Sequence, residues 1–360
     1  MQLSPRLLLL PFSWLFCLIA RIRNLLFDAG ILPSTSGTVP LISVGNLTVG
    51  GTGKTPLTEY LIRLLSPGRK RCALLSRGYG RQTRGPVMAG ENATPASIGD
   101  EPMQMKQKFP DLLVTVAEKR RAGLEKLMNL PAPPHLVLLD DAFQHRAVKP
   151  DLSILVTDYY RPVYNDLCLP VGNLREPFSG RKRADVIVVN KCPENMSESE
   201  SEQIKKKLAL FPHQKVFFST INYDSPEKLT ENDHETLSFR DVISHEAARI
   251  IAIAAIGNPS PFFEKVHDYK RPVKTLSFPD HYEFTKKGIN KIAAALEKSG
   301  PQTIILTTEK DAVKLRNINL PPDLASKIWF IPIQLKILFH QQETFNKTIE
   351  AYVNTNQRNR

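Results

Sequence analysis

Residues 43–56 read SVGNLTVGGTGKTP, an apolar run that leads into a glycine-rich turn ending in lysine and threonine. The turn resembles the phosphate-binding pattern G-x-x-x-x-G-K-[ST], with Thr48 in place of the first glycine. A strand-like run precedes the turn, and Pro56, which suits the first turn of a helix, follows it. This order of strand, loop and helix predicts a P-loop within an α/β fold.

The residue types in this loop match the chemistry of a triphosphate. Glycines let backbone N–H groups close around phosphate oxygens, and the following helix points the positive end of its dipole at the same anion. Lys54 can reach the β- and γ-phosphates, and the Thr55 hydroxyl can ligate Mg²⁺. The predicted nucleotide-binding residues are Thr48, Val49, Gly50, Gly51, Thr52, Gly53, Lys54 and Thr55.

A pair of carboxylates follows a second buried strand. Asp140 and Asp141 come directly after the apolar residues 136–139, as in a Walker B strand. Two carboxylates at a strand end beside a triphosphate are explained by a divalent cation. A helix cap or turn would explain one aspartate equally well, so the residues leave open which of the two ligates Mg²⁺.

Further apolar runs alternate with stretches that can hold helices, a pattern typical of a parallel sheet covered on both faces. The runs that predict strands of a first set are 72–76, 112–117, 135–141, 152–158 and 185–191. A second α/β set begins after a polar stretch, at 249–259, 302–312 and 327–333. We therefore expect an N-terminal helix in 1–32, a P-loop core in 33–235, a smaller α/β domain in 236–345 and a tail in 346–360.

Composition narrows the function classes. Of the 360 residues, 42% are hydrophobic and 23% charged, which excludes a polytopic membrane protein and a mostly disordered chain. Lysine plus arginine number 48 against 36 acidic residues, a net charge of +12 that favours an anionic partner. The four cysteines form no C-x-x-C pair, so we expect neither a disulfide framework nor a cysteine zinc site, and a reducing compartment.

The N-terminus carries an apolar run at 7–20 flanked by Arg6, Arg21 and Arg23. The run is shorter than the roughly 20 residues that cross a bilayer. No small-residue cleavage site follows it, which disfavours a signal peptide. The pattern fits an interfacial helix on an anionic membrane surface, with an ordinary buried helix as the alternative.

Several more segments occur in an order that resembles the tetraacyldisaccharide 4'-kinase family, the lipid A 4'-kinases of Gram-negative bacteria. The segments that carry the resemblance are SVGNLTVGGTGKTP (43–56), LSRGYGR (75–81), GDEP (99–102), AEKRRAG (117–123), LDDAFQHR (139–146), LPVGNLREP (169–177), VVNK (188–191), FPDHYEF (278–284) and TTEKDAVK (307–314). They span about residues 10 to 335. The chain departs from the family pattern at Ala142, where glycine is usual, and at Tyr282, where a second histidine is frequent.

The resemblance implies two α/β/α domains joined by a short β linker, with the active site in the cleft between them. It also implies that the γ-phosphoryl group of ATP passes, with Mg²⁺, to the 4'-hydroxyl of an acylated glucosamine disaccharide 1-phosphate, which yields lipid IVA. The expected location is the cytoplasmic face of the inner membrane, with the N-terminal helix as the docking element. We expect a monomer.

The resemblance also assigns roles in the reaction. The base that accepts the hydroxyl proton is the aspartate of GDEP, Asp100, assisted by the histidine of FPDH, His281, from the second domain. Lys54 stabilises charge on the transferring phosphoryl group. On the residues alone, the alternatives are a helix cap for Asp100 and a surface histidine for His281.

Other charged residues are candidates for phosphate or metal. Glu176, in LREP, is a further candidate metal ligand, with a surface carboxylate as the alternative. Because guanidinium groups pair bidentately with phosphate, four arginines are candidates for the substrate phosphate, although charged runs are usually solvated. They are Arg77, Arg81, Arg120 and Arg121.

Two other function classes compete with the lipid kinase. A soluble GTPase or ATPase of the metallochaperone or partitioning type shares the P-loop, but a GTPase needs N-K-x-D, and Pro193 stands where that aspartate would be. Asn190-Lys191 is therefore a weak nucleotide-pocket signal. A nucleic-acid-binding ATPase would need interleaved aromatic and basic residues, which are absent, so we expect no nucleic-acid partner.

Overall fold

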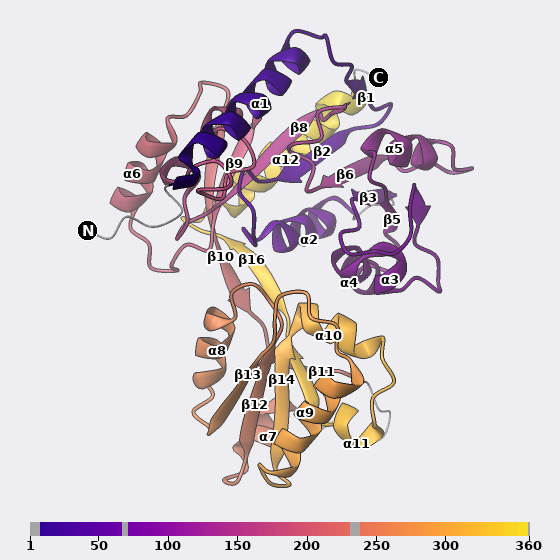
Figure 1. Cartoon of the computed structure of the whole chain (residues 1–360), viewed down its shortest axis with the longest axis vertical. Coiled ribbons are helices and arrows are strands. Elements are labelled where there is room, and N and C mark those ends of the chain that lie inside the picture. Colours follow the sequence, from indigo (N-terminus) through magenta and orange to yellow (C-terminus); the bar gives the residue numbers. More distant parts are fainter. Residues whose placement is uncertain (1–7, 67–70, 231–237, 359–360) are drawn as a thin grey trace.

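The structure is a computed structural model that describes residues 8–66, 71–230 and 238–358. Its core is formed by two mainly parallel β-sheets, and Figure 1 shows strands β10 and β16 passing from one to the other. The longer helices are α1 (Leu10–Asp28), α2 (Lys54–Leu65), α4 (Asp100–Lys108), α5 (Arg120–Met128), α6 (Glu198–Leu208), α8 (Ser260–His267), α9 (Lys286–Glu297), α10 (Glu309–Arg316) and α12 (Gln342–Arg358). The short ones are α3 (Pro95–Ile98), α7 (Phe239–Ser244), α11 (Pro322–Ala325), η2 (Val163–Asn165) and η3 (Phe178–Arg183).

Within the described residues the larger sheet has nine strands, in the order β16-β10-β9-β8-β2-β6-β3-β5-β4. All neighbours are parallel except the two edge pairs, β16 with β10 and β4 with β5. The strands are β2 (Leu41–Gly45), β3 (Cys72–Ser76), β4 (Val87–Met88), β5 (Leu113–Val116), β6 (Leu136–Asp140), β8 (Leu152–Asp158), β9 (Val186–Asn190), β10 (Lys215–Tyr223) and β16 (Ile333–Ile337). The small strands β1 (Thr35–Ser36) and β7 (Val148–Lys149) pair separately.

Both faces of this sheet are buried, which explains why its strands are continuous apolar runs. Alternate residues of each strand point to opposite faces, so Leu138 joins the cluster packed by α2, α4 and α12, whereas Val137 and Leu139 join the cluster packed by α5. Beside the α5 cluster, α6 covers β8 and β9 through Ile204 and Leu208. This is the α/β/α layering that the sequence predicts.

The smaller sheet has the order β11-β15-β14-β12-β13 in the described chain. Its strands are β11 (Glu227–Lys228), β12 (Arg249–Ala254), β13 (Val273–Ser277), β14 (Thr303–Thr308) and β15 (Ile328–Ile331). After β15 the chain returns through β16 to the larger sheet and ends in α12. The expected α/β fold with a second, smaller α/β unit is confirmed. The expected boundary at 235/236 lies in segment 231–237, outside the described residues, and the domain division stays a prediction.

Helix α1 is arranged inside out. Its buried residues are the polar Ser13 and Asn24, whereas Phe12, Trp14 and Ile19 are 62%, 68% and 59% exposed. Within the described residues, α1 is the one helix whose length and composition would suffice to cross a membrane. Apolar side chains that face outward from a helix, with polar ones facing the protein, are typical of a helix that lies on a membrane or on another apolar surface.

The cysteines differ from the expectation. Cys17 of α1 and Cys168 form a disulfide across a sequence separation of 151 residues, whereas Cys72 and Cys192 are free and buried. We expected no disulfide framework, and this one disulfide differs from that expectation. The disulfide lies beside the hydrogen bond from Ser13 Oγ to the carbonyl of Cys168, so both fasten α1 to the same loop.

The two sheets are held together by charged side chains on α2, α4 and α10. Lys108, at the end of α4, forms ion pairs with Glu59 of α2, at 2.7 Å, and with Glu309 at the start of α10. The Glu59 side chain is only 1% exposed, and burial, followed by the charge of Glu309, raises its pKa. Lys108 therefore separates two carboxylates that would otherwise repel each other in a buried position.

We predict that Lys108→Met lowers the free energy of unfolding by about 2 kcal/mol, because it leaves Glu59 and Glu309 without their shared cation. Urea denaturation followed by circular dichroism measures the effect. Lys347→Met is the matched control, since its ion pair with Glu343 is 72% and 79% exposed, and it should change stability little. Equal stability of the two variants would contradict a structural role for the buried ion pair.

Candidate functional site: a P-loop beside paired carboxylates

The glycine-rich turn lies between β2 and α2, at the carboxyl edge of the larger sheet. Gly50 and Gly53 have φ angles of 97° and 89°, which side-chain-bearing residues rarely adopt. A Cβ on Gly53 would also lie 1.9 Å from Nδ2 of Asn190. No side chain caps α2, which begins at Lys54, so its first N–H groups are available to an anion.

The end of β9 supports the loop from one side. Asn190 donates from Nδ2 to the carbonyl of Thr52 at 3.0 Å, and Lys191 donates from Nζ to the carbonyl of Gly51. Lys191 also forms an ion pair with Asp158 of β8 at 2.7 Å. The Asn190-Lys191 pair, a weak nucleotide signal in the sequence, thus braces the phosphate loop through its backbone.

The paired carboxylates lie next to the loop, because β6 is the neighbour of β2. Asp141 is 3.4 Å from Nζ of Lys54 and accepts hydrogen bonds from Arg175 at 3.0 and 3.1 Å. Burial alone would raise the pKa of Asp141, but the charges of Lys54 and Arg175 outweigh it and hold that pKa below its usual value. Asp140 accepts from Ser76 Oγ at 3.2 Å.

Burial raises the pKa of Asp140 to about 7, and the negative charges of Glu101 and Asp141 add to the rise. A buried carboxylate under this repulsion gains from a nearby cation. The described residues contain no group of three or more His, Cys, Asp or Glu side chains that could hold a metal ion without other ligands. This donor set fits Mg²⁺, which is bound by one or two carboxylates together with substrate phosphates.

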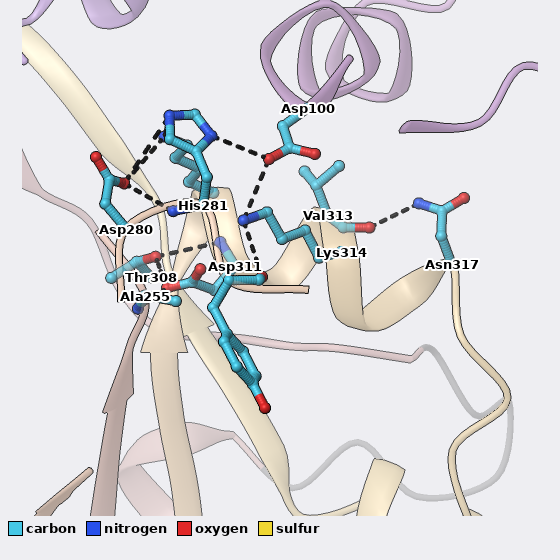
Figure 2. Close-up of polar contacts among 11 residues, drawn as sticks. Asp100, Ala255, Asp280, His281, Thr308, Asp311, Val313, Lys314 and Asn317 are labelled. Carbon is cyan, nitrogen blue, oxygen red and sulfur yellow. Dashed lines mark hydrogen bonds and ion pairs between the residues drawn. The ribbon is translucent and has the colours of Figure 1, made fainter. Parts of the chain in front are cut away.

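Asp100 and His281 meet across the two sheets (Figure 2). Asp100 is the first residue of α4, and His281 lies between β13 and α9; Nδ1 of His281 is 3.4 Å from Oδ2 of Asp100. Burial would raise the pKa of Asp100, but the hydrogen bond from His281 and the charge of Lys314 keep it below the usual value. The side chain therefore stays ionised near neutral pH, as a base requires.

Backbone strain marks the same residues. Asp141 and His281 adopt positive φ angles of 45° and 57°, and Lys191 adopts 63°. Non-glycine residues are uncommon in this region and are found where the surrounding structure fixes them, frequently at functional sites.

The four candidate arginines occupy different environments. Arg120 is 2% exposed and donates to the backbone carbonyl of Asp140 at 2.8 Å; burial lowers its pKa to about 10. Arg77 is exposed beside Arg120. The guanidinium of Arg81 instead binds Glu118 and nearby backbone carbonyls, and Arg121 forms an exposed ion pair with Glu125. The structure thus brings Arg77 and Arg120 toward the carboxylate pair, but engages Arg81 and Arg121 elsewhere.

Glu176 is fully buried and accepts hydrogen bonds from Asn24 of α1 at 2.6 Å, from Gln144 at 3.0 Å and from Arg183 at 2.7 Å. Gln144 also donates to the carbonyl of Asn46, just before the phosphate loop. Glu176 therefore connects α1 to the nucleotide loop. The structure does not bring it into contact with Asp140 or Asp141 among the described interactions.

Sequence reasoning missed two functional candidates, Arg175 on Asp141 and Lys314 on Asp100, although both lie in segments that carry the resemblance. His145 lies four residues after Asp141 along the chain. Burial, followed by the charges of Arg120 and Arg77, lowers the pKa of His145 to about 4, so its imidazole is neutral.

Comparison with known proteins identifies the family. The model of the family described as tetraacyldisaccharide-1-P 4'-kinase matches residues 5–354. The chain belongs to this family. A tetraacyldisaccharide 4'-kinase of Bacteroides thetaiotaomicron is 43% identical over 98% of this chain and 94% of its own length. One of Flavobacterium johnsoniae is 44% identical, over 98% of each chain.

A solved member of the 4'-kinase family has the same fold. The crystal structure of LpxK from Aquifex aeolicus in complex with ATP gives a TM-score of 0.75 at 31% identity and covers 97% of this chain and 100% of its own. Family membership and this fold confirm the predicted kinase family and disfavour the GTPase alternative.

We predict that Lys54→Met lowers kcat/KM for ATP at least about 100-fold, because it removes the cation aimed at the transferring phosphoryl group. Steady-state kinetics with varied ATP checks this. Lys206→Met removes an exposed lysine of α6 and should leave turnover unchanged. An active Lys54→Met enzyme would show that the lysine does not contact the nucleotide.

Proposed function

We propose that this chain is an ATP-dependent lipid kinase that phosphorylates the 4'-hydroxyl of a tetraacylated glucosamine disaccharide 1-phosphate, which forms lipid IVA. The observation that carries the proposal is the pair of Asp100, at the start of α4, and His281, in the loop after β13, which meet at 3.4 Å. A phosphate loop explains nucleotide binding alone, whereas an ionised carboxylate held at the domain interface supplies a base for an acceptor alcohol.

In the proposed reaction Asp100 accepts the proton of the 4'-hydroxyl while that oxygen forms a bond to the γ-phosphorus. The bond from the γ-phosphorus to the bridging oxygen breaks, and ADP leaves with the electron pair. Lys54 and the N–H groups at the start of α2 stabilise the charge on the phosphoryl oxygens. His281 holds Asp100 in place from the second sheet.

Thr55, Asp140 and Asp141 are the residues that would hold Mg²⁺. When bound, Mg²⁺ offsets charge on the phosphate oxygens and orients them. Glu176, whose oxygens already accept three hydrogen bonds, would position α1 and Gln144 rather than reach the cation. For the substrate's 1-phosphate we retain Arg77, which is exposed, whereas Arg120 is buried and donates to the backbone carbonyl of Asp140.

The inside-out helix α1 supports a location at the membrane surface. Its exposed apolar side chains would lie among the acyl chains of the inner membrane, on the cytoplasmic face where ATP is present, while Asn24 and Ser13 hold the helix to the protein. The net charge of +12 favours an anionic surface. We also propose that the protein is a monomer.

We predict that Asp100→Ala lowers kcat at least about 100-fold and leaves ATP binding largely intact, because the proton acceptor is lost but the P-loop is unchanged. Incubation with labelled ATP, Mg²⁺ and the tetraacylated disaccharide monophosphate, followed by mass spectrometry, measures the lipid that gains one phosphate.

Asp111→Ala is the matched control, since it removes an exposed aspartate in the turn after α4. Near-normal turnover by Asp100→Ala would exclude Asp100 as the base. A wild-type enzyme that transfers no phosphate to the lipid would refute the proposed function itself.

We further predict that the combined change Phe12→Ser, Trp14→Ser and Ile19→Ser reduces binding to phosphatidylglycerol vesicles at least about 10-fold, because it removes apolar area that would enter the bilayer. Co-sedimentation measures binding. Turnover of a short-chain, water-soluble acceptor should be retained. Undiminished sedimentation would show that α1 does not dock the protein on the membrane.

A further inference from the structure

Lys314 is a buried lysine that contacts the proposed base. Its side chain is only 7% exposed, and its Nζ lies 3.1 Å from Oδ2 of Asp100. The same Nζ donates to the backbone carbonyl of Tyr282 at 3.2 Å, in the loop that carries His281. Figure 2 shows Lys314 beside the carboxylate of Asp100. Lys314 therefore joins Asp100 to the histidine loop.

The position of Lys314 is set by the packing of α10 on α4. Lys314, near the end of α10, faces Asp100 at the start of α4, whereas Glu309 at the start of α10 faces Lys108 at the end of α4. The two helices are thus antiparallel, with one ion pair at each end. In one pair the lysine lies on α4, and in the other it lies on α10. Sliding one helix against the other would break both pairs, so this arrangement fixes where Nζ meets the carboxylate.

The charged groups around Asp100 are distributed unevenly. Both His281 and Lys314 contact Oδ2, and among the described residues no interaction is made with Oδ1. Behind His281, its Nε2 faces Lys310 at 3.3 Å and Asp280 at 3.9 Å, and the exposed Tyr79 ring lies 5.6 Å from the imidazole. Glu101 follows Asp100 on α4. One carboxylate oxygen is therefore held by two donors, and the other is left for a ligand.

We propose that Lys314 is a positioning residue for phosphoryl transfer: it holds Oδ2 of Asp100 so that Oδ1 is presented, as a carboxylate, to the acceptor hydroxyl. The proposal rests on the role of Asp100 as the base. His281 alone cannot replace Lys314, because a lysine carries a permanent positive charge, whereas an imidazole is charged only when it is protonated. Lys314 itself does not touch the transferring group.

Lys314→Met tests this, because methionine keeps an unbranched side chain in the buried position. We expect kcat to fall about 10- to 100-fold, as for loss of a group that supports a catalytic residue, while KM for ATP changes little. Without the nearby cation the carboxylate ionises less readily, so the acidic limb of the kcat/KM profile should move to higher pH. Lys314→Arg, which keeps the charge, should restore part of the activity and return the limb toward its original position.

Lys287→Met is the control. It removes an exposed lysine of α9, a helix that packs on the smaller sheet, and should alter neither kcat nor the pH profile. A Lys314→Met enzyme that loses activity equally at every pH, with the acidic limb unmoved, would overturn the proposal in favour of a purely structural role.

The Asp100→Asn variant distinguishes the role of Lys314 as a positioning residue from the role of Asp100 as the base, on which it rests. If Lys314 acts through Asp100, adding Lys314→Met to Asp100→Asn should lower the residual rate no further. A further loss of 10-fold or more in that background would mean that Lys314 contacts the substrate itself, and would overturn the positioning role. Full activity of Asp100→Asn alone would instead refute the role of Asp100 as the base.

Discussion

The contact between α4 and α10 is the constraint on which the site depends. The phosphate loop follows β2 of the larger sheet, and Asp100 begins α4, which packs on that sheet. His281 lies in the loop after β13 of the smaller sheet, and Lys314 lies on α10, which packs on the smaller sheet. Only when the two helices pack antiparallel, with Lys108 on Glu309 and Lys314 on Asp100, does the imidazole reach the carboxylate. In the proposed mechanism, the groups that act on the substrate would therefore be brought together only when the two sheets are arranged in this way.

Charge is arranged in this site to receive a polyanion. Lys54 and Arg175 offset Asp141, while Asp140 carries a pKa raised by burial and by its acidic neighbours. A bound cation would offset the negative charges at Asp140, and a triphosphate would offset the positive charges of Lys54 and Arg175. Helix α1 is connected to the same region, because Asn24 binds Glu176, and Gln144 bridges Glu176 to the backbone just before the loop. The surface that would meet the lipid and the loop that would meet the nucleotide thus share one hydrogen-bonded chain.

The sequence predicted features that depend on local pattern. Each of the nine apolar runs proposed as strands is a strand, because burial on both faces of a parallel sheet leaves a continuous apolar signature. The P-loop was predicted from its glycine-rich turn ending in lysine and threonine, and Asp140 and Asp141 from their place after an apolar run. The family resemblance supplied Asp100 and His281. Contacts between distant segments carried no such signal: Asn24 meets Glu176 across 152 residues, and Cys17 pairs with Cys168 across 151. The positions of Lys314 and Arg175 follow likewise from helix packing and loop geometry, which no short motif encodes.

The most direct test is a crystal structure of the enzyme with a non-hydrolysable ATP analogue, Mg²⁺ and the tetraacylated disaccharide monophosphate. The account predicts that the 4'-hydroxyl lies within hydrogen-bond distance of Asp100 and in line with the γ-phosphorus, with His281 still in contact with the carboxylate. A complex in which the acceptor hydroxyl meets a different base, or in which the two sheets separate so that His281 leaves Asp100, would contradict it.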